Sequence, residues 1–149
     1  MSISWKYIAG FFDGEGSICH NGKGFRITVS QSSYGVLKDI KVFVGLGNIF
    51  ETKKRQEHWK DSWVYYIAKQ EDVYTFLMRI LPFLIVKKKL ALKTLPELKR
   101  NVEQIKKRKN RTKKNIIQAK KLRKQGLSYR KIGKKMNIDF GHARRLTLK

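Results

Sequence analysis

Apolar residues recur at helical spacing in four segments of the first part of the chain, and they alternate with polar residues in segments typical of strands. The pattern predicts helices over 4–13, 34–44, 71–81 and 84–95, and strands over 17–20, 25–31, 48–53 and 62–68. The strand at 25–31 alternates most cleanly, because Phe25, Ile27 and Val29 take one side and polar residues take the other. One face of the predicted sheet is therefore buried and the other is open.

The order of these elements is αββαββα, and the strands come in two pairs. Asn21-Gly22, between the first two strands, is a dipeptide typical of β-hairpins, and a charged loop at 54–61 separates the other two strands. Such pairs predict an antiparallel sheet with helices on one face. The predicted fold class is α+β: a twisted antiparallel four-stranded sheet in this order, followed by a small all-α C-terminal module.

Charge divides the chain into three parts. Its 149 residues hold 35 Lys+Arg and 11 Asp+Glu, a formal net charge of +24, of which +7 falls in 1–96 and +17 in 97–149. The 41% of hydrophobic residues is enough for a folded core, which excludes general disorder. We predict a globular domain at 1–96, a basic helical connector at 97–114 and a small helical module at 115–149.

A net charge of +24 on a chain of this size requires a polyanionic partner, and nucleic acid is the first choice. An acidic membrane surface is the second choice, but no strongly amphipathic basic helix stands out, and the apolar stretch at 80–86 is too short to span a bilayer. The lone Cys19 fits a reducing compartment, so we expect an intracellular protein. The open sheet face, with Arg26, Thr28 and Ser30, either enters the DNA major groove or is an ordinary solvated surface.

The segment 8–16 combines small residues with carboxylates. Gly10 and Gly14 lie four residues apart, so they share one helix face and allow a second backbone to approach closely. Asp13 and Glu15 then place two carboxylates at the end of the helix, where oxygen ligands suit Mg²⁺. On these residues alone, a solvated acidic turn is the simpler interpretation.

The same segment resembles the LAGLIDADG motif of homing endonucleases. The nine motif positions are Ile8, Ala9, Gly10, Phe11, Phe12, Asp13, Gly14, Glu15 and Gly16. The αββαββα order is also the order of that family, so the resemblance implies its saddle-shaped sheet over about residues 1–95. Because this chain has a single motif, it resembles the homodimeric members of the family, in which two motif helices pack on the dyad and form two active sites.

The resemblance implies roles for individual residues. Glu15 would ligate a catalytic divalent metal together with the Gly14 carbonyl, Gln31 would position solvent, and Lys87, with Lys88 and Lys89 as competitors, would stabilise charge. Two or three Mg²⁺ ions would serve each dimer. The dimer interface implied by the motif consists of Ala9, Gly10, Asp13 and Gly14.

The last part of the chain, at 126–133, resembles the helix-turn-helix of resolvase-like DNA-binding domains, with Arg144 and Arg145 on the recognition helix. The alternative is a basic appendage that contacts phosphates only. The run at 106–114 predicts a phosphate-binding or minor-groove arm. In all, the DNA-binding residues that we predict are Ser17, Asn21, Lys23, Arg26, Thr28, Ser30, Lys53, Arg55, Lys88, Lys89, Arg108, Arg111, Arg144 and Arg145.

These features lead to one functional prediction and two alternatives. The prediction is a homodimeric, Mg²⁺-dependent, intron-encoded endonuclease that cuts double-stranded DNA at a long pseudo-palindromic site. The first alternative is an intron maturase or other RNA-binding protein on the same fold, with its own intron RNA as partner. The second is a DNA-binding regulator that does not cleave.

Overall fold

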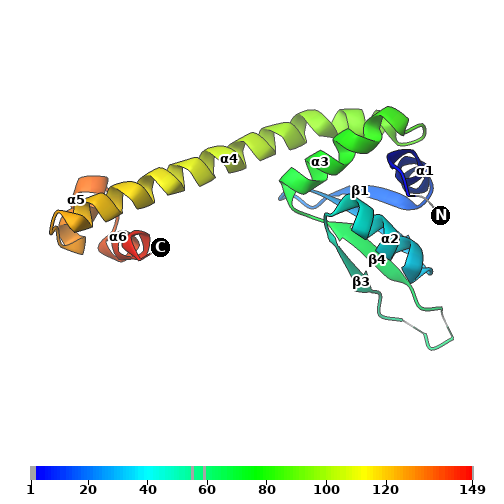
Figure 1. The fold of residues 1–149 in the computed structure, drawn as a ribbon, viewed down its shortest axis with the longest axis horizontal. Helices are drawn as coiled ribbons and strands as arrows, with labels where there is room; N and C mark the ends of the chain where they lie inside the picture. Colours follow the sequence, from blue (N-terminus) through cyan, green and yellow to red (C-terminus); the bar gives the residue numbers. More distant parts are fainter. Residues whose placement is uncertain (1–2, 55, 59, 149) are drawn as a thin grey trace. The chain divides into compact units, whose positions relative to one another are not determined.

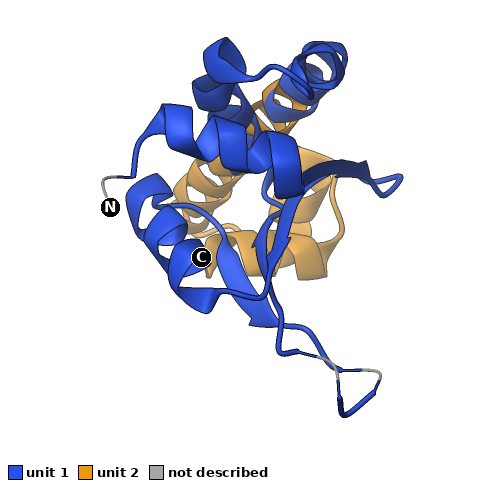
Figure 2. Ribbon diagram, turned by 90° about the vertical axis from the view of Figure 1, so that its right-hand side faces the viewer, with its two compact units in different colours: residues 1–102 blue, residues 103–149 orange. Residues whose placement is uncertain are grey.

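The computed structural model describes residues 3–54, 56–58 and 60–148. Within them the chain forms two compact units, residues 1–102 and 103–149 (Figure 2). The elements of the first unit, traced in Figure 1, are α1 (Trp5–Glu15), β1 (Gly16–His20), β2 (Phe25–Gln31), α2 (Tyr34–Val44), β3 (Asn48–Glu51), β4 (Trp63–Ile67), α3 (Gln70–Ile80), the short 3₁₀ helix η1 (Leu81–Phe83) and the start of α4 (Lys88–Lys124).

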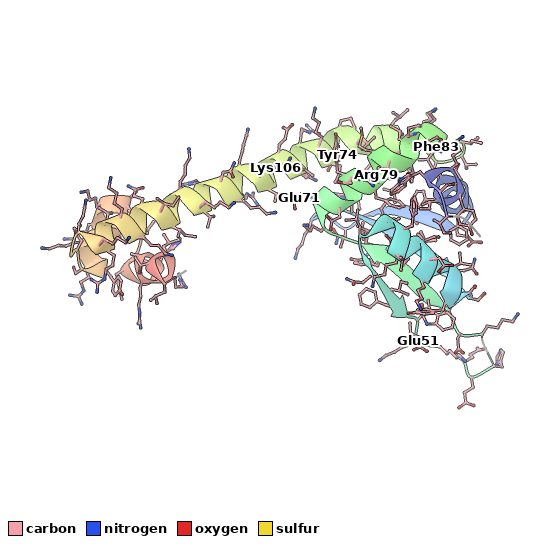
Figure 3. All side chains as sticks on the ribbon, viewed as in Figure 1. Glu51, Glu71, Tyr74, Arg79, Phe83 and Lys106 are labelled. Carbon is pink, nitrogen blue, oxygen red and sulfur yellow. The ribbon has the colours of Figure 1, made fainter. Side chains whose placement is uncertain are left out.

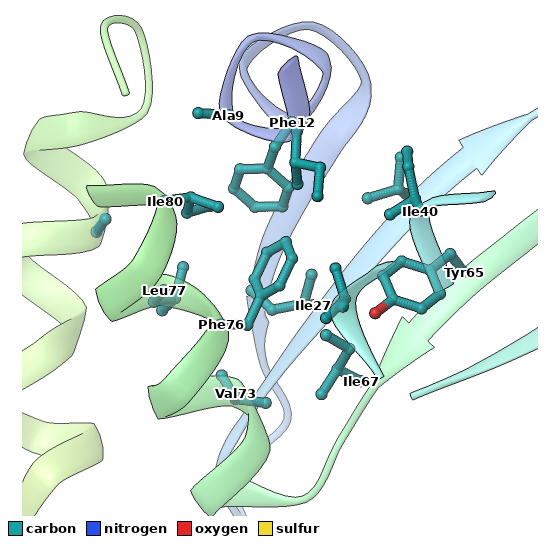
Figure 4. Packing of buried hydrophobic residues seen from close by; sticks show 14 of the residues in the cluster. Ala9, Phe12, Ile27, Ile40, Tyr65, Ile67, Val73, Phe76, Leu77 and Ile80 are labelled. Atoms are coloured by element: carbon teal, nitrogen blue, oxygen red, sulfur yellow. The ribbon is translucent and has the colours of Figure 1, made fainter. Parts of the chain in front are cut away.

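The four strands form one antiparallel sheet in the order β1-β2-β4-β3, which confirms the predicted fold class. Alternation along the strands turns Ile27, Val29, Tyr65 and Ile67 toward the helices, and all four are buried. Figure 4 shows side chains of this group meeting those of α1 and α3, including Phe12. The apolar core therefore lies between the sheet and its helices, and the other face of the sheet carries the polar residues.

Helix α1 begins where its sequence favours a start and ends two residues later than predicted. Ser4 caps it by accepting a hydrogen bond from Tyr7 N at 3.2 Å. The helix ends at Glu15, and Gly16 begins strand β1 directly. A Cβ built on Gly16 would lie 2.0 Å from the Phe12 ring, so close packing requires glycine here. Glu15 is therefore the last residue of the helix.

The β1–β2 hairpin has the loop that the predicted strands leave between them. Its loop has four residues, closed by a 3.1 Å hydrogen bond from Asn21 N to Gly24 O. Gln70 lies beside it, accepting from Phe25 N at 2.9 Å and donating to Phe25 O at 2.7 Å, as a neighbouring strand would. A side chain on Gly24 would meet Gln70, so this contact favours glycine at the end of the loop.

Helix α4 does not stop at Pro96, although the sequence predicted a helix end there and a change of domain. It runs from Lys88 to Lys124, and the predicted boundaries at 96 and 114 both fall inside it. Proline removes one backbone hydrogen bond, but Leu98 and Val102 beyond it are buried, and Leu98 belongs to the same core as Ala91. Continued burial of one helix face holds the helix together past the proline.

The second unit is a small helical body with its own core. The end of α4 packs with α5 (Tyr129–Met136) and α6 (Phe140–Thr147) around five buried residues, which are Ala119, Leu122, Ile132, Ala143 and Leu146. Ser128 and Asp139 cap the two short helices, and Asn137 ends α5 with a φ of 53°. No described helix is long and apolar enough to cross a membrane.

Candidate active site

Asp13 joins the last turn of α1 to the turn that precedes α4. Its Oδ2 accepts hydrogen bonds from Ile85 N at 2.7 Å and Val86 N at 3.2 Å, and its Oδ1 accepts one from Lys87 N at 2.8 Å. Partial burial alone would raise the pKa of Asp13, but the amide donors of Ile85, Lys87 and Val86 and the charge of Lys87 outweigh it, so this pKa lies below its usual value. Asp13, predicted for a dimer interface, thus has its carboxylate engaged inside its own chain.

Lys87 is tied to the end of α1, and this distinguishes it from its two neighbours. Its ammonium group donates a hydrogen bond to the backbone carbonyl of Asp13, and its side chain is half-buried. Lys88 and Lys89 begin α4 and are exposed. The sequence left three lysines in competition, whereas the geometry places Lys87 beside the motif helix.

Glu15 and Gln31 come to the same end of the sheet. Gly16 is the register partner of Val29, so Glu15 lies just before the paired part of β1, where β2 continues toward Gln31. Glu15 is exposed. The Gln31 Oε1 accepts hydrogen bonds from Ser32 N at 2.8 Å and Ser32 Oγ at 3.2 Å, which hold the amide at the strand end. Glu15, Gln31 and Lys87 therefore surround the junction of α1 with the sheet.

The donors at this junction suit a hard divalent cation, but one chain supplies few of them. The Glu15 carboxylate and the Gly14 carbonyl are oxygen ligands of the kind that Mg²⁺ prefers. Among the described residues, no group of three or more His, Cys, Asp and Glu side chains could hold a metal ion.

One face of α1 is left open by its own chain. Gly10 and Gly14 are exposed, and a Cβ built on either would meet nothing within 4 Å. Tyr7 and Phe11, whose rings stack at 6.0 Å, lie at the matching helical positions and are only partly buried. Ala9 was predicted to belong to this face, but it is fully buried in the core of its own chain, so that prediction is wrong.

The open face of the sheet carries the predicted polar residues, and Arg26 is the most constrained of them. Arg26 pairs across the strands with Cys19, and its Nε is buried without a hydrogen-bond partner among the described residues. Cys19 Sγ lies 3.2 Å from Ser17 Oγ, and this contact, helped by Arg26 and Thr28, keeps the pKa of the thiol below its usual value despite some burial. The Cys19–Arg26 pair thus puts positive charge in the middle of this face.

Sequence reasoning missed three further residues on the open face. Asn48 pairs with Tyr66, which in turn pairs with Thr28, so these side chains share a face with Thr28. Phe50 is exposed on the same face, and its ring packs edge-on against Tyr66 at 6.1 Å. The alternation of Asn48 and Phe50 with the partly buried Ile49 was the sequence pattern that could have placed Asn48 and Phe50 on the open face.

Apart from Thr28, the remaining predicted DNA-binding residues that the structure describes are exposed to solvent. Ser17, Asn21, Lys23, Ser30, Lys53, Lys88, Lys89, Arg108, Arg111, Arg144 and Arg145 are exposed, and Thr28 is half-buried. Arg55 lies outside the described residues. The basic residues of α4 project outward from the helix, as Lys106 does in Figure 3.

In the second unit, the exposed side of α6 is both basic and apolar. Arg144 and Arg145 are exposed beside Phe140, which is 64% exposed. His142 is half-buried, and its amide donates to the capping Asp139 Oδ1 at 2.8 Å.

Comparison with known proteins identifies the first unit. A family model described as a LAGLIDADG-like domain matches residues 3–81. The homing endonuclease I-CvuI in complex with its target has a similar fold (TM-score 0.53, 23% identity, 67% of this chain and 68% of that chain), and so has I-CvuI in complex with the I-CreI target (TM-score 0.50, 23% identity, 64% and 65%). In this last comparison the match spans slightly less than two thirds of the known chain.

A third structure matches across both units. The archaeal intron-encoded homing endonuclease I-Vdi141I, complexed with DNA, has a TM-score of 0.52 and 22% identity, and the match covers 95% of this chain and 92% of that one. At these identities the similarity concerns the fold. A search of curated protein sequences gave no match.

Proposed function

The chain belongs to the family of LAGLIDADG-like domains, and from this membership we propose that it is a homing endonuclease that cuts double-stranded DNA at a specific site. The observation that carries the proposal is the end of the motif helix α1, where Glu15 is the exposed last residue and the Lys87 ammonium donates to the Asp13 carbonyl two residues before it. A carboxylate and an ammonium group at the same end of one helix suit hydrolysis of a phosphodiester bond.

Each residue of the junction has a task in this proposal. Glu15 and the Gly14 carbonyl would hold Mg²⁺, with two or three ions per dimer. The metal would supply an activated water and would relieve the charge on the scissile phosphate. Lys87 offsets the negative charge that develops in the transition state. Gln31, held at the end of β2 by Ser32, orients solvent at the reacting phosphate.

The proposed active form is a homodimer, because each copy carries a single motif. Each copy contributes one exposed motif carboxylate, and cleavage of two strands needs two sites. The open face of α1, which is Tyr7, Gly10, Phe11 and Gly14, has room for the backbone of a second α1. Two copies related by a twofold axis would read a pseudo-palindromic target.

DNA recognition is divided between the two units in this proposal. The open sheet face, with Arg26 at its centre, enters the major groove beside the cut. The second unit acts as a helix-turn-helix, with α6 as its recognition helix and Phe140, Arg144 and Arg145 closest to the bases. Exposed arginines along α4, such as Arg108 and Arg111, contact phosphates.

Replacing the metal ligand tests the proposed reaction. Glu15→Gln keeps the size of the side chain but removes its charge, so we expect no detectable cleavage in Mg²⁺ and nearly unchanged specific binding. The measurement is single-turnover cleavage of a selected target, with binding followed in Ca²⁺. Glu57→Gln is the matched control, because Glu57 is exposed in the loop before β4 and we expect it to cut like the wild type.

Two results would count against the proposal. If Glu15→Gln cuts at the wild-type rate, Glu15 is not the metal ligand. If the wild-type protein binds a specific site but cuts nothing in any divalent metal, the chain is a DNA-binding regulator on a nuclease fold.

A further inference from the structure

The Asp13 carboxylate makes an unusual number of contacts with one short segment that is distant in sequence. It accepts from the amides of Ile85, Val86 and Lys87, three consecutive residues that lie 72 to 74 positions further along the chain. Both carboxylate oxygens are used, and the Asp13 backbone carbonyl receives the Lys87 ammonium. One residue therefore fixes both the backbone and the side chain of Lys87.

This arrangement does more than cap a helix. A capping side chain usually bonds an amide two or three residues away in its own helix, as Asp139 does with His142. Asp13 instead holds a turn before α4 whose side chains at Ile85 and Val86 are 85% and 74% exposed and so add little packing of their own. Leu84, just before them, is buried in the core, so the hydrogen bonds to Asp13 fix the part of the turn that no core side chain holds.

We propose that Asp13 is a positioning residue, which orients the Lys87 ammonium at the end of α1 for DNA cleavage. The inference rests on the proposed nuclease function and adds a role for a motif residue that does not itself touch the DNA. Three charge-assisted hydrogen bonds to one carboxylate are strong enough to set the path of the turn. Without them, Lys87 is free to sample other positions, and small displacements of a catalytic group reduce rates steeply.

A double-mutant cycle separates positioning from general stabilisation. Lys87→Ala removes a charged donor, and we expect single-turnover cleavage to slow by about a hundredfold or more. Asp13→Ala should slow it by about ten- to a hundredfold with little change in DNA affinity, and Asp13→Asn, which keeps one acceptor oxygen, by less. In the Lys87→Ala background, Asp13→Ala should add almost nothing, because the group that it positions is already gone.

Amide hydrogen exchange supplies a readout that does not depend on activity. In the wild-type protein the amides of Ile85, Val86 and Lys87 should be protected, and in Asp13→Ala they should exchange faster while the core amides of β2 stay protected. Asp72→Asn is the matched control. It removes a carboxylate, paired with Lys69 at 3.1 Å, in the first turn of α3, so the cleavage rate and the exchange at 85–87 should not change.

The outcomes distinguish this inference from the proposed function. Equal slowing by Asp13→Ala in the wild-type and Lys87→Ala backgrounds would overturn the positioning role, and so would unchanged exchange at 85–87. If Asp13→Ala does not fold, Asp13→Asn carries the same cycle. A wild-type protein that cuts no DNA overturns the nuclease function and the catalytic part of the inference, whereas the exchange result still decides whether Asp13 holds the turn.

Discussion

The two compact units differ in the size of their hydrophobic cores and in their net charge. Residues 1–102 bury large side chains between a sheet and its helices and hold 17 Lys+Arg against 9 Asp+Glu. Residues 103–149 have a core of five small or medium residues and hold 18 Lys+Arg against 2 Asp+Glu. Cleavage needs groups fixed to within fractions of an ångström, which a large core provides, whereas affinity for a polyanion needs mainly charge. In the proposed function, the first unit carries the chemistry and the second unit contributes much of the binding energy.

The largest effect that we expect is the loss of dimerisation and cleavage after a substitution in the open face of α1. Gly10→Leu adds a bulky side chain where a second copy would pack, so the dimer should separate and double-strand cleavage should fall by more than about a hundredfold. Sedimentation and cleavage assays measure the two effects. Gly35→Leu is the matched control, since Gly35 is also exposed on a helix with open space around its Cβ. A dimeric and active Gly10→Leu protein would remove α1 from the interface.

We expect a smaller effect on DNA binding from a substitution in the core of the second unit. Ile132 is fully buried there, so Ile132→Ala should destabilise this unit by about 2–5 kcal/mol and weaken DNA binding at elevated temperature. The cut position should not move. Ile117→Ala, at a position 68% exposed, is the control with the same chemical change. Thermal unfolding and binding isotherms test the pair, and altered cut positions in Ile132→Ala would mean that the second unit takes part in the chemistry.

Much of the fold followed from local patterns, and the failures have physical causes. Tyr34–Val44 and Phe25–Gln31 match their predicted ranges because periodicity and turn residues agree there. The helix end predicted before Pro96 was wrong, because burial of Leu98 and Val102 outweighs the missing hydrogen bond. The hydrogen bonds between Gln70 and Phe25 were not predicted, because the two residues lie 45 positions apart in the sequence.

The candidate site was predictable only where a motif marked it. Glu15 and Lys87 were predicted through the motif resemblance, but nothing local indicates that Asp13 bonds to residues more than 70 positions away. Ala9 was wrongly grouped with Gly10 because adjacent helical residues point about 100° apart, and only packing shows which one is buried. Contacts between distant segments are the part that sequence patterns do not carry.

Removing the part of the second unit that holds its core tests the division most directly. Residues 115–149 are deleted, and cut positions, footprint and salt dependence are compared with those of the full chain. We predict the same cleaved phosphates in Mg²⁺ at low salt, a shorter footprint, a higher dissociation constant and a flatter salt dependence, with the slope reduced by about 0.9 for each phosphate that the shortened protein no longer neutralises. A cut that moves to other phosphates, or a footprint that stays the same, would contradict the assignment of chemistry to the first unit and binding to the second.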